Sequence, residues 1–482
     1  MYLWYARRKP HFLLYSSWEI ENCFVYSIRR NKLKKTITGI LIFTLLITSC
    51  GFENDKKVEK PNVEKLMSES DTTTLILATF NEDTDMLKQI ELFNQTNEDY
   101  QIELKVYERS SDPAEDGLLK IQREIVSGNG PDMIDFGYSY STSDVVAEYT
   151  EDLYPYLLEE PDFNQEAYFM NIFDAFSYEN NLYAIPTSFV LKTFAGKKEV
   201  LDNLDHWNIN QMMTLYEKQE EGMLLYPGET KMDVFATILS GNIDSFIDWE
   251  TGVCSFDSEA FQKLLTFCNM FPDKLNIDND FSVKQTFLDG KALICPATLL
   301  EVYDICHYES LFDESEISYI GFPTDGDSGT VITPGNHMLA ISMGSNHKEV
   351  SWDFIYSFLK KDYQQNLSHQ FPLSREVVEE QLADNLEPEY IVSSDGSQKK
   401  IVKYQVRFDG DLAIDVYNIT QEQADKLLSI IENAAITSSP DYIMYYPLCE
   451  EAAAYFAGEK TVEEVVAIIQ NRATIYVNEK VN

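Results

Sequence analysis

The chain has 482 residues, of which 44% are hydrophobic and 13% aromatic, and its formal net charge at pH 7 is −42. A charge this negative excludes a nucleic-acid partner and general attraction to anionic lipid, because both carry phosphates that the protein would repel. The length and the apolar fraction are sufficient for two domains with sizeable cores.

Residues 1–49 have the pattern of a targeting segment. Basic residues such as Arg29 and Lys35 precede an apolar run at 40–47. The stretch 37–49 that contains this run is shorter than the roughly 20 residues of a membrane span and fits a secretory signal peptide. The residues Ile47-Thr48-Ser49-Cys50 resemble a bacterial lipobox, in which the cysteine is acylated, palmitate being a typical chain, and becomes the mature N-terminus. We therefore expect a lipoprotein anchored through Cys50 to the extracellular face of the bacterial cell membrane. Residues 1–26 are interpreted as an N-terminal extension outside any fold.

The segment that follows, 50–72, is rich in Glu, Asp, Lys, Asn and Ser and predicts a disordered tether. Eight of the 38 basic residues but only two of the 80 acidic residues precede Cys50, so the remaining chain is more acidic still. Five cysteines remain after the tether, an odd number, and the six histidines show no metal-ligand spacing. We expect neither a metal nor another cofactor.

From Thr73 the chain reads as alternating strands and helices. The run 74–79 predicts a buried strand, 85–94 carries apolar residues at helical spacing, and 100–107 alternates as a second strand. This is a βαβ unit, which implies a parallel sheet. A helix at 114–127 and a strand at 133–136 repeat the unit.

The chain is expected to leave this first sheet in extended form at 182–189, where Pro186 forbids a helix. A second compact region, 190–328, follows before the chain crosses back around 334–341. Its predicted elements are helices at 208–219, 231–239, 258–270 and 282–289 and a strand at 292–295. The last third predicts helices at 348–359, 422–434, 447–457 and 461–479. Thr461 and Glu464 form a capping box at the start of the last helix.

Short motifs in a characteristic order support a family assignment. They are Phe80-Asn81, Gly130-Pro131-Asp132-Met133-Ile134-Asp135, Leu182-Tyr183-Ala184-Ile185-Pro186, Asp248-Trp249-Glu250-Thr251-Gly252, Gly290-Lys291-Ala292, Gly321-Phe322-Pro323, and the stretch 453–472. Together they resemble the extracellular solute-binding proteins of ABC importers, the class that includes maltose-binding protein. The resemblance covers about 74–479.

This resemblance implies an α/β fold with two lobes of the periplasmic-binding-protein type II, hinge-crossing segments and C-terminal helices. It places lobe 1 at 73–186 plus 334–385 and lobe 2 at 190–330 plus 417–482, with a polar insertion at 386–416. It further implies a monomer that captures a small solute, most often a sugar or oligosaccharide, by lobe closure for the permease of an ABC importer.

Parallel α/β sheets bind ligands beyond the carboxyl ends of their strands. The loops at those ends supply the candidates for the first lobe and the crossings, which are Asn81, Tyr138, Tyr140, Thr187, Ser188, Phe189 and Asn336. The tyrosine pair offers flat faces and hydroxyls to a sugar ring. For the second lobe the resemblance implies Thr298, Tyr445 and Tyr446. Many sugar binders have tryptophan near Thr298 and this chain does not, so a small polar solute or a peptide stays open as the ligand.

Two other function classes stay open. A sensor or surface partner protein could use the same ligand-gated closure without delivering its ligand. A secreted glycoside hydrolase would need two carboxyl groups facing each other across a cleft, and in so acidic a chain candidate pairs carry no information. The chain has no GxSxG, HExxH or P-loop motif, and we expect no enzyme activity.

Overall fold

The computed structural model describes residues 72–481, except for 110–115, 138–143, 202–203, 205–206, 250, 275–282, 313–315, 325–328, 388–389, 393–395, 408–412 and 438–441. The chain divides into compact units between Glu69 and Ser70, so every described element belongs to the second unit. Among the described residues, no helix has the length and apolar character to cross a membrane.

The first sheet has five strands in the order β2-β1-β3-β11-β4. Their bounds are β1 Thr73–Thr79, β2 Tyr100–Val106, β3 Met133–Asp135, β4 Ile185–Pro186 and β11 Met338–Ile341. Strand β1 runs parallel to β2 and β3, which confirms the predicted βαβ unit, whereas β11 is antiparallel to both β3 and β4. The carboxyl ends of β1 and β3 therefore meet at one edge of the sheet.

The helices of this region are short, and side-chain caps help to fix where they begin. Asp83 caps α2 and Asp116 caps α3, each accepting from two backbone N–H groups of the first turn. The elements are α2 Thr84–Thr96, α3 Gly117–Val126, α4 Asp144–Ala147, α5 Tyr154–Glu159, η2 Gln165–Ala167, α6 Met170–Ala175, α13 Lys348–Ser357, α14 Lys361–Gln364 and α15 Arg375–Asp384.

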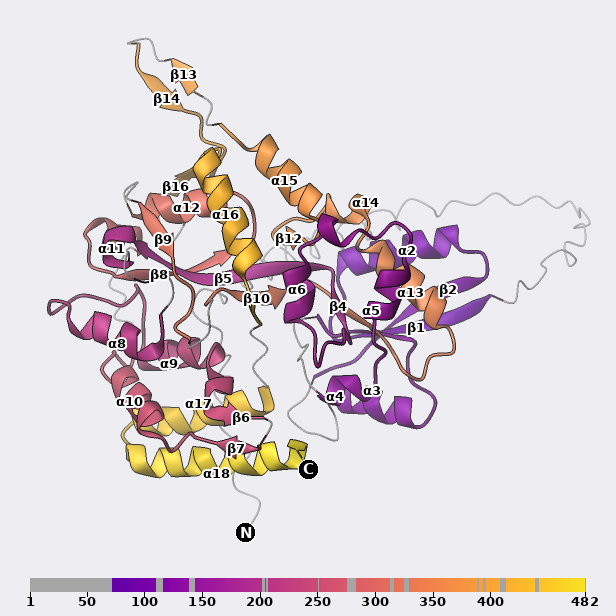
Figure 1. Ribbon diagram of the computed structural model, residues 1–482, viewed down its shortest axis with the longest axis horizontal. Coiled ribbons are helices and arrows are strands. Elements are labelled where there is room, and N and C mark those ends of the chain that lie inside the picture. The colour runs from indigo at the N-terminus through magenta and orange to yellow at the C-terminus, as the bar shows by residue number, and fades with distance from the viewer. Residues whose placement is uncertain are drawn as a thin grey trace, which may run out of the picture. The chain divides into compact units, whose positions relative to one another are not determined.

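The second sheet is built around β5, which spans Ser188–Lys197 and appears in magenta in Figure 1. Its backbone order is β12-β5-β10-β17, and β8 and β9 also pair with β5. The bounds are β8 Ile294–Leu299, β9 Ile317–Tyr319, β10 Val331–Pro334, β12 Phe371–Pro372 and β17 Ile436–Thr437. Strand β12 lies inside the range predicted for lobe 1 but pairs with β5.

The remaining helices and hairpins lie between and after these strands. The helices are α7 Lys198–Leu201, α8 Ile209–Glu217, α9 Lys231–Ser240, η3 Ile243–Phe246, α10 Glu259–Cys268, α11 Val283–Leu288, α12 Asp304–Leu311, α16 Gln421–Asn433, α17 Tyr442–Phe456 and α18 Val462–Val481. The hairpins are β6 Ile247–Asp248 with β7 Val253–Cys254, β13 Tyr390–Val392 with β14 Gln398–Lys400, and β15 Tyr404–Arg407 with β16 Ala413–Val416.

Two buried clusters form the core, and β5 contributes to both. Leu191 and Ala195 belong to the cluster that includes the first sheet, whereas Phe194 belongs to the cluster under α9, α10, α17 and α18. The alternation of side chains along a strand explains how neighbouring residues reach different clusters. Trp207 is fully buried in the second cluster and donates its indole N–H to the backbone oxygen of Gly321 at 2.8 Å.

Candidate functional site: the strand-end edge and the crossing segments

The loop after β1 is fixed by Thr79 at the carboxyl end of that strand. Thr79 is 2% exposed, and its Oγ1 lies 2.9 Å from the backbone oxygen of Asn81 and 3.4 Å from Asp135 Oδ2. The backbone N–H of Asn81 donates back to Thr79 Oγ1 at 3.3 Å. One buried hydroxyl thus holds the predicted ligand residue Asn81, which is itself exposed, beside the end of β3.

His337 lies buried between two carboxylates at this edge. Its Nδ1 is 2.8 Å from Asp135 Oδ2 and its Nε2 is 3.1 Å from Asp83 Oδ2, while the histidine is only 1% exposed. Burial alone would lower the pKa of His337, but its hydrogen bond to Asp135 and the negative charges of Asp135 and Asp83 raise it to about 10. Burial likewise opposes ionisation of Asp83, yet His337 and the backbone donors of α2 leave its pKa below the ordinary value. The geometry and this raised pKa favour a protonated imidazole between the two carboxyl groups.

The two carboxylates also bind backbone groups. Asp135 Oδ1 accepts from the N–H of Gly137 at 3.0 Å and of Met338 at 3.2 Å, and Asp83 Oδ1 caps α2. This Asp83–His337–Asp135 network therefore ties together the start of α2, the end of β3 and the segment that enters β11. These are three of the loops at which the sequence predicts ligand binding.

The network predicts distinct titrations for the two buried histidines. Folding raises the pKa of His337 from 6.5 to about 10, so its stabilising contribution is complete below about pH 6.5 and is lost as the pH rises through about 10. Burial lowers the pKa of His307 to about 4, so that ring should stay neutral. Imidazole NMR signals followed against pH should show one histidine still protonated at about pH 8 and another still neutral at about pH 6. A neutral His337 at pH 8 would contradict the network.

Three segments cross between the two sheets, and Gln370 joins them. Its Oε1 accepts from Ser188 Oγ at 2.6 Å and from the backbone N–H of Asn336 at 3.0 Å. Gly335 makes this junction possible, because a Cβ there would lie 1.9 Å from Ser188 Oγ and 2.3 Å from Gln370 Oε1. The sequence predicts the crossings at 182–189 and 334–341, whereas the third crossing, which contains β12, was missed.

Gln364 also holds the third crossing, through hydrogen bonds to the backbone before and after β12 and to the first crossing. Its Nε2 donates to the backbone oxygens of Thr187 and Phe358, both at 2.8 Å, and its Oε1 accepts from the N–H of Leu373 at 2.6 Å. Gln364 is fully buried. A buried amide whose donors and acceptor are all used specifies one arrangement of the backbone around it.

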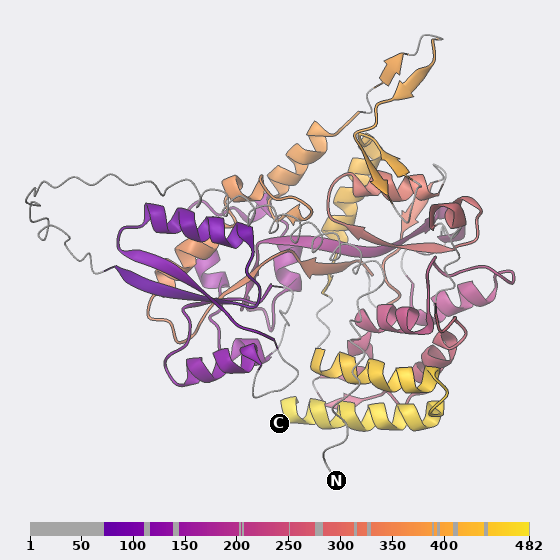
Figure 2. The same cartoon turned by 180° about the vertical axis from the view of Figure 1, so that it is seen from behind.

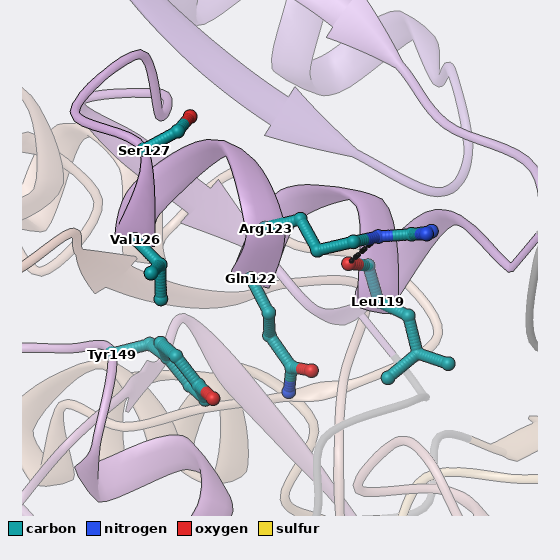
Figure 3. Close-up of a pocket in the computed structure, with 6 residues that line it drawn as sticks. All are labelled: Leu119, Gln122, Arg123, Val126, Ser127 and Tyr149. Carbon is teal, nitrogen blue, oxygen red and sulfur yellow. Dashed lines mark hydrogen bonds between the residues drawn. The ribbon is translucent and has the colours of Figure 1, made fainter.

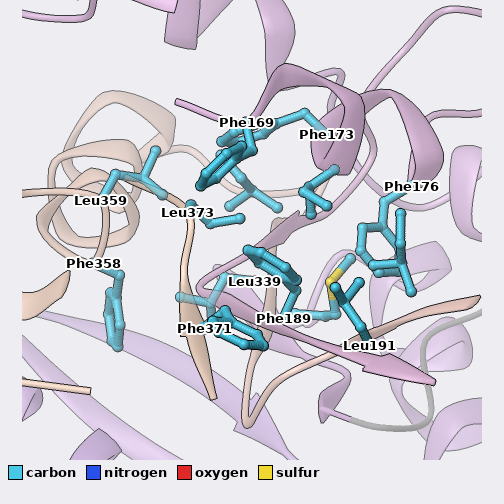
Figure 4. Close-up of a cluster of buried hydrophobic side chains, with 14 of the residues drawn as sticks. Phe169, Phe173, Phe176, Phe189, Leu191, Leu339, Phe358, Leu359, Phe371 and Leu373 are labelled. Atoms are coloured by element: carbon cyan, nitrogen blue, oxygen red, sulfur yellow. The ribbon is translucent and has the colours of Figure 1, made fainter. Parts of the chain in front are cut away.

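The predicted residues of the first crossing are interior groups in this structure. Thr187, Ser188 and Phe189 each have 0% exposure. The Phe189 ring stacks on Phe371 at 5.5 Å between centroids and meets Phe169 edge-on at 6.2 Å (Figure 4). Phe189 is thus part of the hydrophobic core, on a strand that is buried on both faces, and Ser188 uses its hydroxyl to bind Gln370.

The predicted residues of the second lobe make contacts with two different helices, Thr298 with α12 and Tyr445 with α9. The backbone N–H of Thr298, which is half-buried, donates to the hydroxyl of Tyr308 at 2.9 Å. The hydroxyl of Tyr445 donates to the backbone oxygen of Ala236 at 3.3 Å, and the ring of Tyr446, 47% exposed, lies 5.8 Å from that of Tyr445. Among these candidates, Tyr446 presents the largest open aromatic face described. Tyr138, Tyr140 and Cys50 fall outside the described residues.

Two surface hollows lie away from these residues. One, of about 390 Å³, runs along α3 and is lined by Leu119, Gln122, Arg123, Val126, Ser127 and Tyr149 (Figure 3). The other, of about 620 Å³, is lined by Tyr154, Asp174, Ser177, Glu179 and Asn180. Neither lining contains a residue predicted to bind ligand.

The part of the chain that the structure describes offers no group of three or more His, Cys, Asp or Glu side chains able to hold a metal ion. Its five cysteines are buried. Desolvation raises the pKa of Cys449 to about 12 and that of Cys268 well above its usual value, which disfavours thiolate chemistry at these two positions.

Comparison with known proteins agrees with this architecture. The chain is similar in structure to the sugar-binding protein MalE from Xanthomonas citri, with a TM-score of 0.53 and 13% identity over 84% of this chain and 98% of that one. A periplasmic oligogalacturonide-binding protein from Yersinia enterocolitica gives 0.51 and 14% over 85% and 100%. An ABC substrate-binding protein from Listeria monocytogenes in complex with cycloalternan gives 0.50 and 13% over 85% and 100%.

These likenesses confirm the predicted two-lobe α/β fold of the periplasmic-binding-protein type. No curated protein matches the chain at a significant level. A family model described as bacterial extracellular solute-binding protein matches residues 88–377, more than half of the chain, and this range includes β2, β3 and all three crossing segments. The chain therefore belongs to the bacterial extracellular solute-binding protein family.

Proposed function

We propose that this protein captures a sugar or oligosaccharide outside the cytoplasm and presents it to the permease of an ABC importer. The family match carries the proposal, since it assigns solute binding to the chain. The three structural neighbours named above, which are described as binding sugars, oligogalacturonide and cycloalternan, support the choice of carbohydrate. Binding takes place without turnover.

Lobe closure is the proposed mechanism. Ligand that bridges the strand-end edge of the first sheet and the Thr298, Tyr445 and Tyr446 positions of the second region favours the closed form by the contacts it adds there. The Gln370 junction lets the crossing segments bend as one unit, because Gln370 lies in the third crossing and its buried Oε1 accepts hydrogen bonds from the other two. The lobe ranges 73–186 plus 334–385 and 190–330 plus 417–482 are part of this proposal.

The site combines a rigid edge with an aromatic platform. Asn81 and Asn336 stand beside the Thr79 and Gln370 contacts that position their backbones. Tyr446 supplies a ring face of the kind on which sugar rings stack. Attachment to the membrane through an acylated Cys50, with 51–72 as tether, and a monomeric state complete the proposal.

The test is thermal unfolding of residues 51–482 in the presence of mono- and oligosaccharides, with amino acids, peptides and polyols as the other classes. A ligand at a hundred times its dissociation constant should add about 2.7 kcal/mol of stability. Tyr446→Ala should abolish most of that gain because the stacking face is lost, whereas Tyr390→Ala, which removes an equally exposed ring on β13, should leave it intact. Equal loss in both variants would contradict the assigned site.

A second measurement separates the proposed function from its alternatives. Small-angle scattering should show a smaller radius of gyration with the same saccharide. A stabilising peptide with inert sugars would overturn the carbohydrate assignment, and release of product from a glycoside panel would overturn binding without turnover.

A further inference from the structure

The hairpin β13–β14 lies within the polar insertion 386–416, which contains none of the residues assigned to the solute site. We name residues 390–392 and 396–403 the arm (Figures 1 and 2). Every residue of the arm is exposed. Tyr390 pairs with Lys400, Ile391 with Lys399 and Val392 with Gln398, and within the described chain neither strand joins a further strand. The arm is thus a two-stranded sheet with exposed side chains on both faces, although the Lys400 ammonium lies 5.5 Å from the centroid of the Tyr417 ring outside the arm.

The arm concentrates exposed apolar side chains. Val392 is 70% exposed, Ile391 54% and Tyr390 51%, and they are followed by Ile401 at 36% and Val402 at 38%. Apolar residues exposed singly are ordinary, but a contiguous cluster marks a surface that contacts something else. An isolated two-stranded hairpin is also marginal in water, so contact with a partner would add to its stability.

The charge of the arm is opposite to that of the chain. Residues 390–403 contain Lys399, Lys400 and Lys403 and a single acidic residue, whereas the whole chain carries a net charge of −42. The base of the arm is held by hydrogen bonds to the segment before α16, from Lys403 N to Val416 O at 2.8 Å and from Glu387 N to Ile419 O at 3.0 Å. The lysines are therefore a local cationic feature on a fixed base.

We propose that the arm contacts an anionic membrane surface. Alternation places Tyr390, Val392 and Lys400 on one face and Ile391 and Lys399 on the other, so each face combines apolar and cationic groups. A lipid interface favours this combination, with tyrosine at the level of the headgroups, aliphatic residues below it and lysines that reach the phosphates. The rest of the chain repels such a surface, but its field is screened beyond about 10 Å at 0.1 M salt while the arm lysines act at contact.

A weak contact between the arm and the membrane is sufficient to orient the protein. If the chain is tethered by its N-terminus to the same membrane, the arm meets lipid at high effective concentration, and a few lysines and apolar side chains can set how the solute site faces the bilayer. The inference does not depend on which solute the protein binds.

The test is co-sedimentation of residues 51–482, without acylation, with vesicles. This fragment retains every described element, because the compact unit begins at Ser70. Binding should occur on phosphatidylcholine vesicles that contain phosphatidylglycerol, be weaker on phosphatidylcholine alone, and disappear at about 1 M salt, where the screening length is about 3 Å. Lys399→Gln with Lys400→Gln should weaken binding about thirtyfold, on the basis of two lost phosphate attractions.

The matched control is Lys88→Gln with Lys218→Gln, which makes the same change in net charge at exposed lysines outside the arm and should leave binding unchanged. Ile391→Ser should weaken binding without altering its salt dependence. Equal weakening in the arm and control variants, or no binding to anionic vesicles at low salt, would overturn the proposal. So would a concentration-dependent dimer that the arm variant abolishes, since the occupant would then be a second copy of the chain.

Discussion

Replacing His337 with leucine should lower the free energy of unfolding by roughly 3–5 kcal/mol, the cost of breaking a buried ion pair by removing one partner. Asp135 is 3% exposed, and its Oδ2 would lose the cation that now lies 2.8 Å away. Asp83, which bridges the same imidazole to α2, would lose its partner as well. Urea unfolding of the parent and of His337→Leu at neutral pH measures the difference.

His307→Leu is the matched control, because His307 is also buried, at 4% exposure, but is kept neutral by burial that lowers its pKa to about 4. Its replacement should cost much less. The second variant Asp135→Asn, added to His337→Leu, should recover part of the lost stability by removing the unpaired charge. If the two histidine variants lose the same stability, or if Asp135→Asn brings no recovery, the charges of the network do not stabilise the strand-end edge.

Gly335→Ala should destabilise the protein by about 1–3 kcal/mol through overpacking at the junction of the crossing segments. The new Cβ would lie 1.9 Å from Ser188 Oγ and 2.9 Å from Ser188 Cβ, so the side chain that binds Gln370 must move together with its backbone. Chemical unfolding gives the stability. Small-angle scattering with and without the saccharide found by thermal unfolding shows whether closure is also affected.

Gly241→Ala supplies the control at a glycine whose added Cβ would meet nothing nearer than 3.6 Å. It should change stability little. Ser188→Ala in the Gly335→Ala background removes the closest atom and should restore part of the stability. Normal closure and unchanged stability in Gly335→Ala would show that the junction tolerates movement and does not couple the crossings.

Local sequence patterns predict the first described strands and helix and the start of the last helix. The spacing of apolar residues predicts α2 and the strands beside it to within a few residues, and the capping box is present, with Thr461 N donating to Glu464 Oε2 at 2.8 Å and Glu464 N to Thr461 Oγ1 at 3.3 Å. The parallel-sheet rule indicates one edge of the first sheet, and the structure brings Asn81 to that edge beside Thr79 and Asp135 and binds Asn336 to Gln370. Ligand binding at this edge stays a prediction.

What the sequence could not show depends on contacts between distant residues. Asp83, Asp135 and His337 form their network only after the chain has crossed twice, and a single sequence shows no link among them. Strand β12 has two residues, too few for any periodicity. Helix α17 starts at Tyr442 and contains Pro447 in its interior, whereas proline's preference for the first turn of a helix predicts a start at Pro447.

The antiparallel pairing of β11 with β3 has a consequence for the order of folding. Ala340 is the partner of Ile134, so the inner edge of β3 stays open until the chain has been made or moved past residue 341. The second sheet waits longer, since Ile436 in β17 pairs with Val331 in β10. Pairings between residues so far apart in the sequence slow folding, and a chain that emerges N-terminus first cannot complete either sheet until most of it is available. The first sheet therefore cannot be completed before residue 341 is available, nor the second before Ile436 is.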